Sequence, residues 1–339
     1  MTAPRAVVFS VSGPELTASE RDFLRDADPL GFILFARNCP DPAATRALTG
    51  ELRAAVGRED APVLIDQEGG RVMRLRPPDW HDAPAARDIA DLYGADPDVG
   101  QAAAETLGRM FGAELAELGI DVDCAPVLDL RLPNTTEALG DRAYADDPAV
   151  VATLGGAMAR GLMREGCLPV IKHMPGHGRS PVDSHKQLPR VTETLEKLQE
   201  TDFAPFRALN HLPLGMSAHV VYEAIDPDRP GTVSPAVISR AIREDIDFDG
   251  FLFTDDIVMQ ALSGTPAERA QAALSAGCDA VLHCSGDLDE MISVAKAIQA
   301  LSHSAEARWT RARAARHKPE GESPASLAAE LTNLLQGGH

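Results

Sequence analysis

The chain has 339 residues, of which 44% are hydrophobic and 24% are charged, and its formal net charge is -19 at pH 7. This composition is typical of a folded protein with a sizeable core and excludes the disordered and fibrous classes. The negative charge repels phosphate backbones and anionic lipids, so we expect neither a nucleic-acid partner nor a membrane-surface partner.

The sequence shows no sign of membrane insertion or export. Its first residues lack the apolar core and cleavage site of a secretory signal. No stretch approaches the ~20 apolar residues that a membrane span needs. The five cysteines are odd in number, scattered and without a CxxC pair, a pattern typical of reduced, buried thiols instead of disulfides or a cysteine zinc site. We therefore expect a cytoplasmic protein.

Eight short runs rich in apolar, β-branched residues predict β-strands. Most are almost continuously apolar, as expected for strands covered on both faces. The runs are 6–12, 31–36, 61–66, 122–130, 168–174, 214–220, 250–256 and 280–285.

Segments with helical spacing separate these strands. They are 43–56, 102–118, 148–164, 194–209, 235–244, 266–276, 288–301 and 324–335. Strands that alternate with helices predict parallel βαβ units, and eight of them favour a closed (β/α)₈ TIM barrel. An open doubly wound sheet remains the alternative. We find no linker and predict a single α/β domain over residues 1–339, with 302–323 as a loop before a terminal helix at about 324–335.

The active site of such a barrel lies at the C-terminal ends of its strands. Polar or charged residues follow nearly every predicted strand, which a barrel built for stability alone would not require. These residues are Asp66 and Arg74 after the third strand, Asp129 and Arg142 after the fourth, Lys172, His173, Asp183 and His185 after the fifth, His219 after the sixth, Asp255 and Asp256 after the seventh, and His283 after the eighth.

One chemistry that these residues suit is glycoside hydrolysis with retention of configuration. It needs a carboxylate nucleophile, which Asp255 or Asp256 would supply, and a group that protonates the leaving oxygen. His185 suits the second role because an imidazole has an unperturbed pKa of ~6.5. Asp183 lies two residues earlier, on the same side of an extended loop, and would orient the imidazole.

Other interpretations of the same residues are structural or metal-binding. His219 and His283 suit core positions, His177 a loop cap, and either aspartate of the seventh strand a helix N-cap. His173 and His177 stand four apart and are potential zinc ligands. That spacing requires a helix, which Pro175 and Gly176 forbid, so we expect no metal site.

The motifs resemble those of glycoside hydrolase family 3, in particular its bacterial β-N-acetylhexosaminidases of peptidoglycan recycling. The similarity covers most of the chain and includes IDQEGGRVMR (65–74), APVLDL (125–130), GDRAY (140–144), KHMPGHG (172–178), DSHKQLP (183–189) and FDGFLFTDD (248–256). This resemblance implies a TIM barrel that works without a cofactor, a metal or an obligate protein partner. It also implies hydrolysis of terminal β-1,4-linked GlcNAc from GlcNAc-1,6-anhydro-MurNAc (peptide) fragments.

The resemblance also implies roles for single residues. Asp255 would be the nucleophile, and His185 the acid/base, oriented by Asp183. The residues expected to bind the sugar are Asp66, Arg74, Arg142, Lys172 and His173. In a regular strand Lys172 and His173 would face opposite sides, so both reach the sugar only if the strand end is irregular.

The sequence departs from the family pattern at two places, and two other functions stay open. Arg179-Ser180 stands where the family usually has Asp-Thr, and Ile257-Val258-Met259 where it usually has Leu-Ser-Met. A phosphorylase is one alternative, because an imidazole such as that of His185 repels phosphate less than a carboxylate does. A barrel that binds muropeptides without cleaving them is the other.

Overall fold

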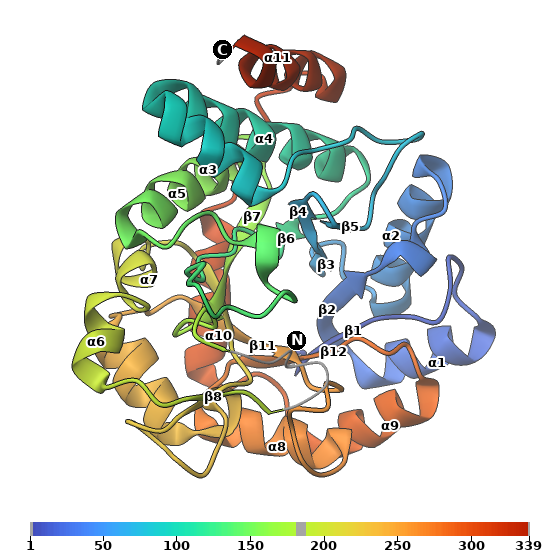
Figure 1. The fold of residues 1–339 in the computed structure, drawn as a ribbon. Helices are drawn as coiled ribbons and strands as arrows, with labels where there is room; N and C mark the ends of the chain where they lie inside the picture. The colour runs from blue at the N-terminus through green and yellow to red at the C-terminus, as the bar shows by residue number, and fades with distance from the viewer. Residues whose placement is uncertain (1–2, 181–187, 338–339) are drawn as a thin grey trace.

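The computed structural model describes residues 3–180 and 188–337, and its centre is a closed barrel of eight parallel strands (Figure 1). The order around the barrel is β1-β12-β11-β9-β7-β6-β3-β2. The strands are β1 (Arg5–Phe9), β2 (Pro29–Leu34), β3 (Val63–Ile65), β6 (Val122–Asp123), β7 (Leu168–Met174), β9 (Leu214–Ser217), β11 (Phe251–Asp256) and β12 (Ala280–His283). All eight predicted strands are confirmed, and the sheet is closed, not open.

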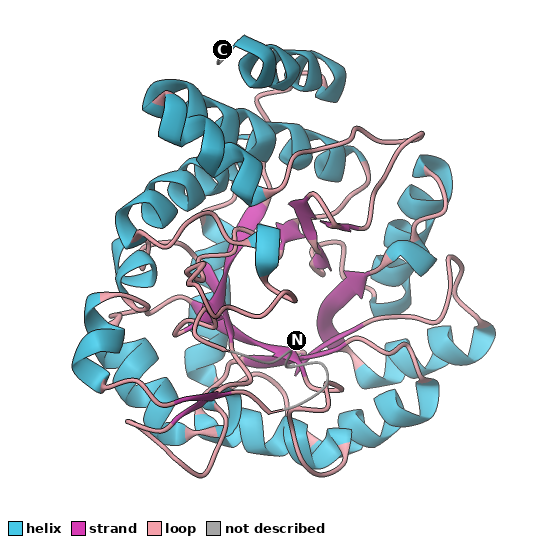
Figure 2. Ribbon diagram, in the orientation of Figure 1, coloured by secondary structure: helices cyan, strands magenta, loops and turns pink. Residues whose placement is uncertain are grey.

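Helices form an outer ring around the strands (Figure 2). The α-helices are α1 (Ala18–Ala27), α2 (Pro42–Val56), α3 (Ala86–Ala95), α4 (Pro97–Glu117), α5 (Pro148–Arg164), α6 (Leu195–Glu200), α7 (Ala204–Ala208), α8 (Pro266–Ala276), α9 (Leu288–Ala297), α10 (His303–Ala314) and α11 (Pro324–Gly337). The 3₁₀-helices are η1 (Ala36–Asn38), η2 (Gly140–Arg142) and η3 (Gly231–Val233). The segment η4 (Val237–Asp245) is a π-helix. Within the described ranges, no helix is both long and apolar enough to cross a bilayer.

Among the described residues, four short strands lie outside the barrel, and two of them carry side chains that line the pocket described below. β4 (Gln67–Gly69) and β5 (Val72–Met73) form an antiparallel hairpin directly after β3. β8 (Arg190–Val191) pairs in parallel with β10 (Val221–Tyr222). The strand-end loops of this barrel therefore carry secondary structure of their own.

Both faces of the barrel strands are buried, which explains their continuous apolar sequences. Val8, Val170 and Met216 belong to a cluster inside the barrel, whereas Val7 and Ile171, their neighbours in sequence, pack in the layer between strands and helices. This double burial fixes the strand register, because a slip by one residue would exchange the two sets.

Two predictions about helices are wrong. The segment 302–323 is not all loop, because it contains α10, which begins where the Ser302 side chain accepts a hydrogen bond from the Ala305 N–H. Trp309 of α10 packs edge-on against Phe251 inside the barrel, with ring centroids 5.3 Å apart. The other error is the segment 194–209, predicted as one helix but divided into α6 and α7.

Candidate active site

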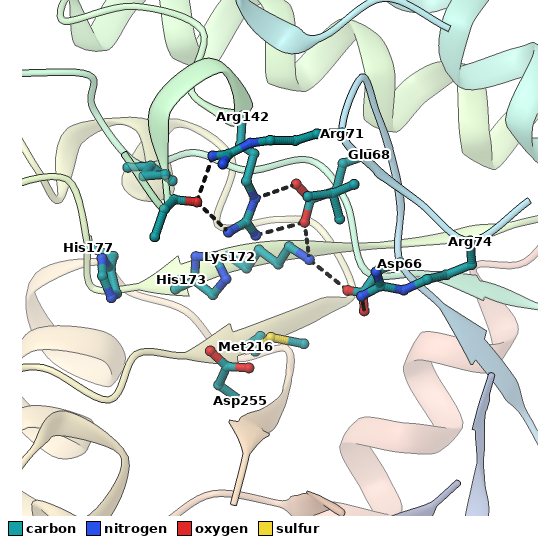
Figure 3. A pocket seen from close by; sticks show the side chains of 13 residues that line it. Asp66, Glu68, Arg71, Arg74, Arg142, Lys172, His173, His177, Met216 and Asp255 are labelled. Carbon is teal, nitrogen blue, oxygen red and sulfur yellow. Dashed lines mark hydrogen bonds and ion pairs between the residues drawn. The ribbon is translucent and has the colours of Figure 1, made fainter. Parts of the chain in front are cut away.

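A pocket of about 410 Å³ opens at the C-terminal ends of the strands (Figure 3). It is lined by Asp66, Glu68, Arg71, Val72, Arg74, Ala138, Leu139, Arg142, Lys172, His173, His177, Met216 and Asp255. The structure thus brings together all five predicted sugar-binding residues and Asp255. Asp183 and His185 lie outside the described residues.

The centre of the pocket wall is a chain of alternating charges (Figure 3). The Lys172 ammonium lies 2.8 Å from Asp66 Oδ1 and 2.6 Å from Glu68 Oε1. Arg142 binds Glu68 through its Nε and Nη2 atoms at 2.7 and 2.8 Å, and Arg74 Nη2 lies 2.9 Å from Asp66 Oδ2. Such charge-assisted pairs hold every member in one orientation and leave the remaining lone pairs and protons to bind hydroxyl groups.

The pairing keeps these buried carboxyl groups ionised. Burial alone would raise the pKa of Asp66, but the charges of Lys172 and Arg74 hold it well below its usual range. Burial likewise opposes ionisation of Glu68, and the charges of Arg142 and Lys172 lower its pKa to about 2. At neutral pH the wall therefore carries fixed anions beside fixed cations, which suits a neutral, hydroxyl-rich ligand.

Sequence reasoning did not single out Glu68. The signal was present, because Glu68 stands two residues after Asp66, and residues at i and i+2 of an extended segment point to the same side. In the structure Glu68 joins the hairpin β4–β5 to both Lys172 and Arg142.

The end of β7 is irregular, as the sequence requires if Lys172 and His173 are to face the same pocket. The pairing of β7 with β9 shifts register between Ile171 and Met174, and the Lys172–His173 peptide bond is cis. Both side chains line the pocket. Asp129, fully buried in the loop that follows β6, accepts a hydrogen bond from His173 Nδ1 at 2.7 Å. Because Asp129 occupies Nδ1, Nε2 is the ring nitrogen of His173 that is left for another partner.

The two aspartates at the end of β11 have different environments. Asp255 lines the pocket and lies below the charged wall in Figure 3. Asp256 Oδ1 instead accepts hydrogen bonds from the N–H groups of Val258 and Cys284, at 3.0 and 3.2 Å. The geometry therefore favours Asp255 over Asp256 as the carboxylate that meets a ligand.

The two carboxyl groups also differ in charge state. Burial opposes ionisation of Asp255, but His173, His219 and the Asp256 N–H outweigh it, and its pKa lies below the ordinary value. Burial and the neighbouring Asp255 charge raise the pKa of Asp256 to about 6. An ionised, partly buried Asp255 is what a nucleophilic carboxylate requires.

Of the other histidines, His177 lines the pocket and His219 supports it. The His177 ring lies 5.9 Å from that of His173, and burial lowers its pKa to about 4, so it is neutral at pH 7. His219 is fully buried and donates from Nε2 to the Asp256 carbonyl at 2.9 Å. In the described part of the chain, no three His, Cys, Asp or Glu side chains gather as metal ligands.

Arg179, one of the residues that differ from the usual family pattern, forms an ion pair with a buried carboxylate. Arg179 Nε donates to Asp202 Oδ2 at 2.6 Å, and its other nitrogens bind Glu193 and Thr201. The Asp202 side chain is only 1% exposed, and burial raises its pKa despite the nearby guanidinium. Arg179 therefore compensates a buried acid next to the KHMPGHG motif.

Known proteins resemble this chain over most of its length. Residues 6–315 match the glycosyl hydrolase family 3 N terminal domain. The Beta-hexosaminidase of Bordetella avium (strain 197N) is 40% identical over 285 residues, covering 83% of this chain and 81% of that protein. The Beta-hexosaminidase of Pseudomonas aeruginosa (strain LESB58) is 37% identical over 311 residues, covering 91% and 90%.

A solved structure has the same architecture. NagZ from Neisseria gonorrhoeae, in complex with N-trifluoroacetyl-D-glucosamine, superposes with a TM-score of 0.88 and 29% identity, over 98% of this chain and 99% of that one. The chain belongs to glycoside hydrolase family 3. Within that family it is a glycoside hydrolase of the bacterial β-hexosaminidase kind.

Proposed function

We propose that the protein is a retaining exo-β-N-acetylglucosaminidase that removes terminal GlcNAc from GlcNAc-1,6-anhydro-MurNAc (peptide) fragments. The observation that carries the proposal is the ionised Asp255 carboxylate in a pocket walled by Asp66, Lys172 and Arg142. A volume of about 410 Å³ is near the low end for small-molecule pockets, ~300–1,000 Å³. It suits one sugar ring and therefore removal of a terminal residue. The free, buried cysteines support a cytoplasmic location.

The proposed reaction has two steps. Asp255 attacks the anomeric carbon, and the bond to the leaving oxygen breaks as His185 gives that oxygen its proton. Water then attacks the same carbon, His185 takes the proton of the water, and the Asp255 carboxylate leaves. Asp183 would hold the imidazole in one tautomer and stabilise its protonated form.

The charge balance of the pocket supports water, not phosphate, as the acceptor. Each cation that lines the pocket has a carboxylate partner: Asp66 for Arg74, Glu68 for Arg142, both for Lys172, and Asp141 for Arg71. A phosphate dianion would have to compete with these carboxylates. Incubation in phosphate buffer should therefore yield free GlcNAc, and accumulation of GlcNAc-1-phosphate would show a phosphorylase instead.

The acid/base assignment is tested with aryl β-GlcNAc substrates that differ in leaving-group pKa. His185→Ala should lose far more activity on poor leaving groups than on good ones, because good leaving groups depart without a proton. His211, exposed before β9 at the other end of the barrel, provides the control His211→Ala, which should match wild type. An equal loss of activity on all leaving groups would mean that His185 is not the proton donor.

A further inference from the structure

The hairpin β4–β5 supplies much of the charged pocket wall from a short piece of chain. Asp66, Glu68, Arg71 and Arg74 all line the pocket, yet β4 has three residues and β5 has two. A hairpin of this length is not stable by itself in water. Another contact must therefore fix the shape of the segment that carries these four side chains.

The side chain of Gln67 makes such a contact from within the hairpin. Gln67 is fully buried, and in the extended β4 segment it alternates with Asp66 and Glu68, so it faces the other way. Its Oε1 accepts hydrogen bonds from the N–H groups of Arg74 and Leu75, at 2.9 and 3.1 Å. Its Nε2 donates to the Leu75 carbonyl at 3.0 Å. One carboxamide thus closes the hairpin where Arg74 leaves it.

The same residue ties the hairpin to the barrel. The backbone N–H of Gln67 donates to Asp123 Oδ1 at 2.9 Å, and Asp123 is a fully buried residue of β6. The hairpin is therefore anchored at its start through the Gln67 backbone and at its end through the Gln67 side chain.

Arg74 is consequently held at both its ends. Its backbone N–H is bound by Gln67, and its guanidinium binds Asp66 Oδ2 at 2.9 Å and lies 5.1 Å from the Phe35 ring centroid. Asp66 immediately precedes Gln67. The distance between Asp66 and Arg74, and with it the placement of Asp66 against Lys172, depends on the closure that Gln67 makes.

We propose that Gln67 is a positioning residue of the sugar subsite, which sets affinity for GlcNAc through Asp66 and Arg74 without touching the sugar. The inference rests on the proposed function, because it takes the ligand of the pocket to be GlcNAc. Only a carboxamide offers an oxygen that accepts two hydrogen bonds and a nitrogen that donates one. Glutamate keeps the acceptors and loses the donor, whereas methionine keeps the length and loses all three bonds.

The test compares Gln67→Met with a control that loses an equally buried hydrogen bond elsewhere. Thr49 is 2% exposed, and its hydroxyl is bonded to the Leu118 carbonyl at 2.8 Å, ahead of β6 and away from the pocket. Gln67→Met should raise both the KM for an aryl β-GlcNAc and the calorimetric Kd for GlcNAc by roughly ten- to hundredfold, with a smaller effect on kcat. Thr49→Val should lower Tm without changing KM or Kd.

A purely structural role for Gln67 predicts a different result. In that case Gln67→Met would lower Tm as Thr49→Val does while KM and Kd stay within about twofold of wild type, and the proposal would be wrong. If Gln67→Met does not fold, Gln67→Glu decides the question: weaker GlcNAc binding supports the proposal, and wild-type binding overturns it.

The calorimetric measurement of GlcNAc binding distinguishes a failure of this inference from a failure of the proposed function. If wild type binds GlcNAc but does not cleave aryl β-GlcNAc, the proposed function is wrong. The Kd values of the variants would still show whether Gln67 sets the affinity of the pocket for GlcNAc. Wild type without measurable affinity for GlcNAc would contradict the sugar subsite and the role of Gln67 together.

Discussion

The Nδ1 atom of His173 lies 2.7 Å from Oδ2 of Asp129, a carboxylate with no exposed surface. Asp129 Oδ1 also accepts from the N–H groups of His173 and His177, at 3.3 and 2.6 Å. One buried anion thus fixes both the ring and the backbone of the KHMPGHG segment. Nε2 is the ring nitrogen of His173 that remains for a ligand in the pocket.

Asp129→Asn should weaken sugar binding by reversing the His173 tautomer. The asparagine oxygen would keep the two backbone hydrogen bonds, so its amide group would face Nδ1 and move the proton to Nε2. Losing a charge-assisted bond of ~1.5–3 kcal/mol should lower kcat/KM roughly ten- to hundredfold. Kinetics and imidazole ¹⁵N shifts check this.

The control for that variant is Asp147→Asn. Asp147 is exposed and caps α5 by accepting from the Ala149 N–H at 2.8 Å, a role that asparagine fills as well. It should leave kcat/KM unchanged. An Asp129→Asn enzyme with wild-type kinetics would show that the His173 tautomer does not matter for binding.

Lys172→Met should destabilise the protein strongly at neutral pH. The Lys172 side chain is 2% exposed and compensates both Asp66 and Glu68. Removing one partner from a buried ion pair costs about 3–5 kcal/mol. Asp66 keeps Arg74 and Glu68 keeps Arg142, so we expect a loss at the lower end of that range. Urea unfolding at pH 7 measures the loss. The control is Lys197→Met, which removes an exposed ion pair with an N–O distance of 3.8 Å. It should change the free energy of unfolding by about 1 kcal/mol or less.

The deficit of Lys172→Met should shrink at lower pH. In wild type the lowered pKa values of Asp66 and Glu68 stabilise the folded state above the unfolded-state pKa values, and this contribution is lost as pH falls. The variant lacks much of this contribution, so the two unfolding free energies should converge as pH falls from about 4 toward about 2, the folded-state pKa of Glu68. A deficit that does not depend on pH would contradict the charge pairing.

Asp256→Asn should make the free energy of unfolding less dependent on pH between about 4 and 6. The folded pKa of Asp256 is raised to about 6 from an ordinary value of 3.8. Its contribution to stability is therefore present at low pH and lost as pH rises through 6. Asparagine keeps the acceptor for Val258 and Cys284 but does not ionise, so the variant should gain stability relative to wild type from pH 4 to pH 7. Urea unfolding at several pH values detects this, and parallel curves would contradict it.

Arg179→Met should destabilise the protein by ~1–3 kcal/mol at pH 7, because it leaves the Asp202 carboxylate buried without its cation. Adding Asp202→Asn should restore most of the loss, since removing both partners of a buried pair is nearly neutral. Urea unfolding of the single and double variants gives the coupling free energy. Losses that simply add would show that the two side chains do not interact.

The barrel and most of its site could be predicted because short stretches of sequence indicate where each strand lies and which residues follow it. A strand buried on both faces must be apolar along its whole length. Such a strand ends where the apolar residues Val170 and Ile171 give way to the KHMPGHG motif. Residues that follow parallel strands meet at one end of a barrel, which is why Asp66, Lys172 and Asp255 share a pocket.

What the sequence did not reveal depends on tertiary contacts. The roles of Glu68 and Gln67 follow from which way a two-strand hairpin faces, and the choice between Asp255 and Asp256 follows from hydrogen bonds to Val258 and Cys284. The helix α10 is weakly amphipathic in sequence and is held by Trp309 against Phe251. Apart from the two-residue spacing of Asp66 and Glu68, spacing along the chain does not indicate these contacts.

The most direct test of the whole account is mass spectrometry of the protein after treatment with a slowly released fluorinated GlcNAc donor. We expect one GlcNAc equivalent, attached to the peptide that contains Asp255, and no label in Asp255→Asn. A sugar on Asp256, or an active enzyme that accumulates no labelled peptide, would contradict it.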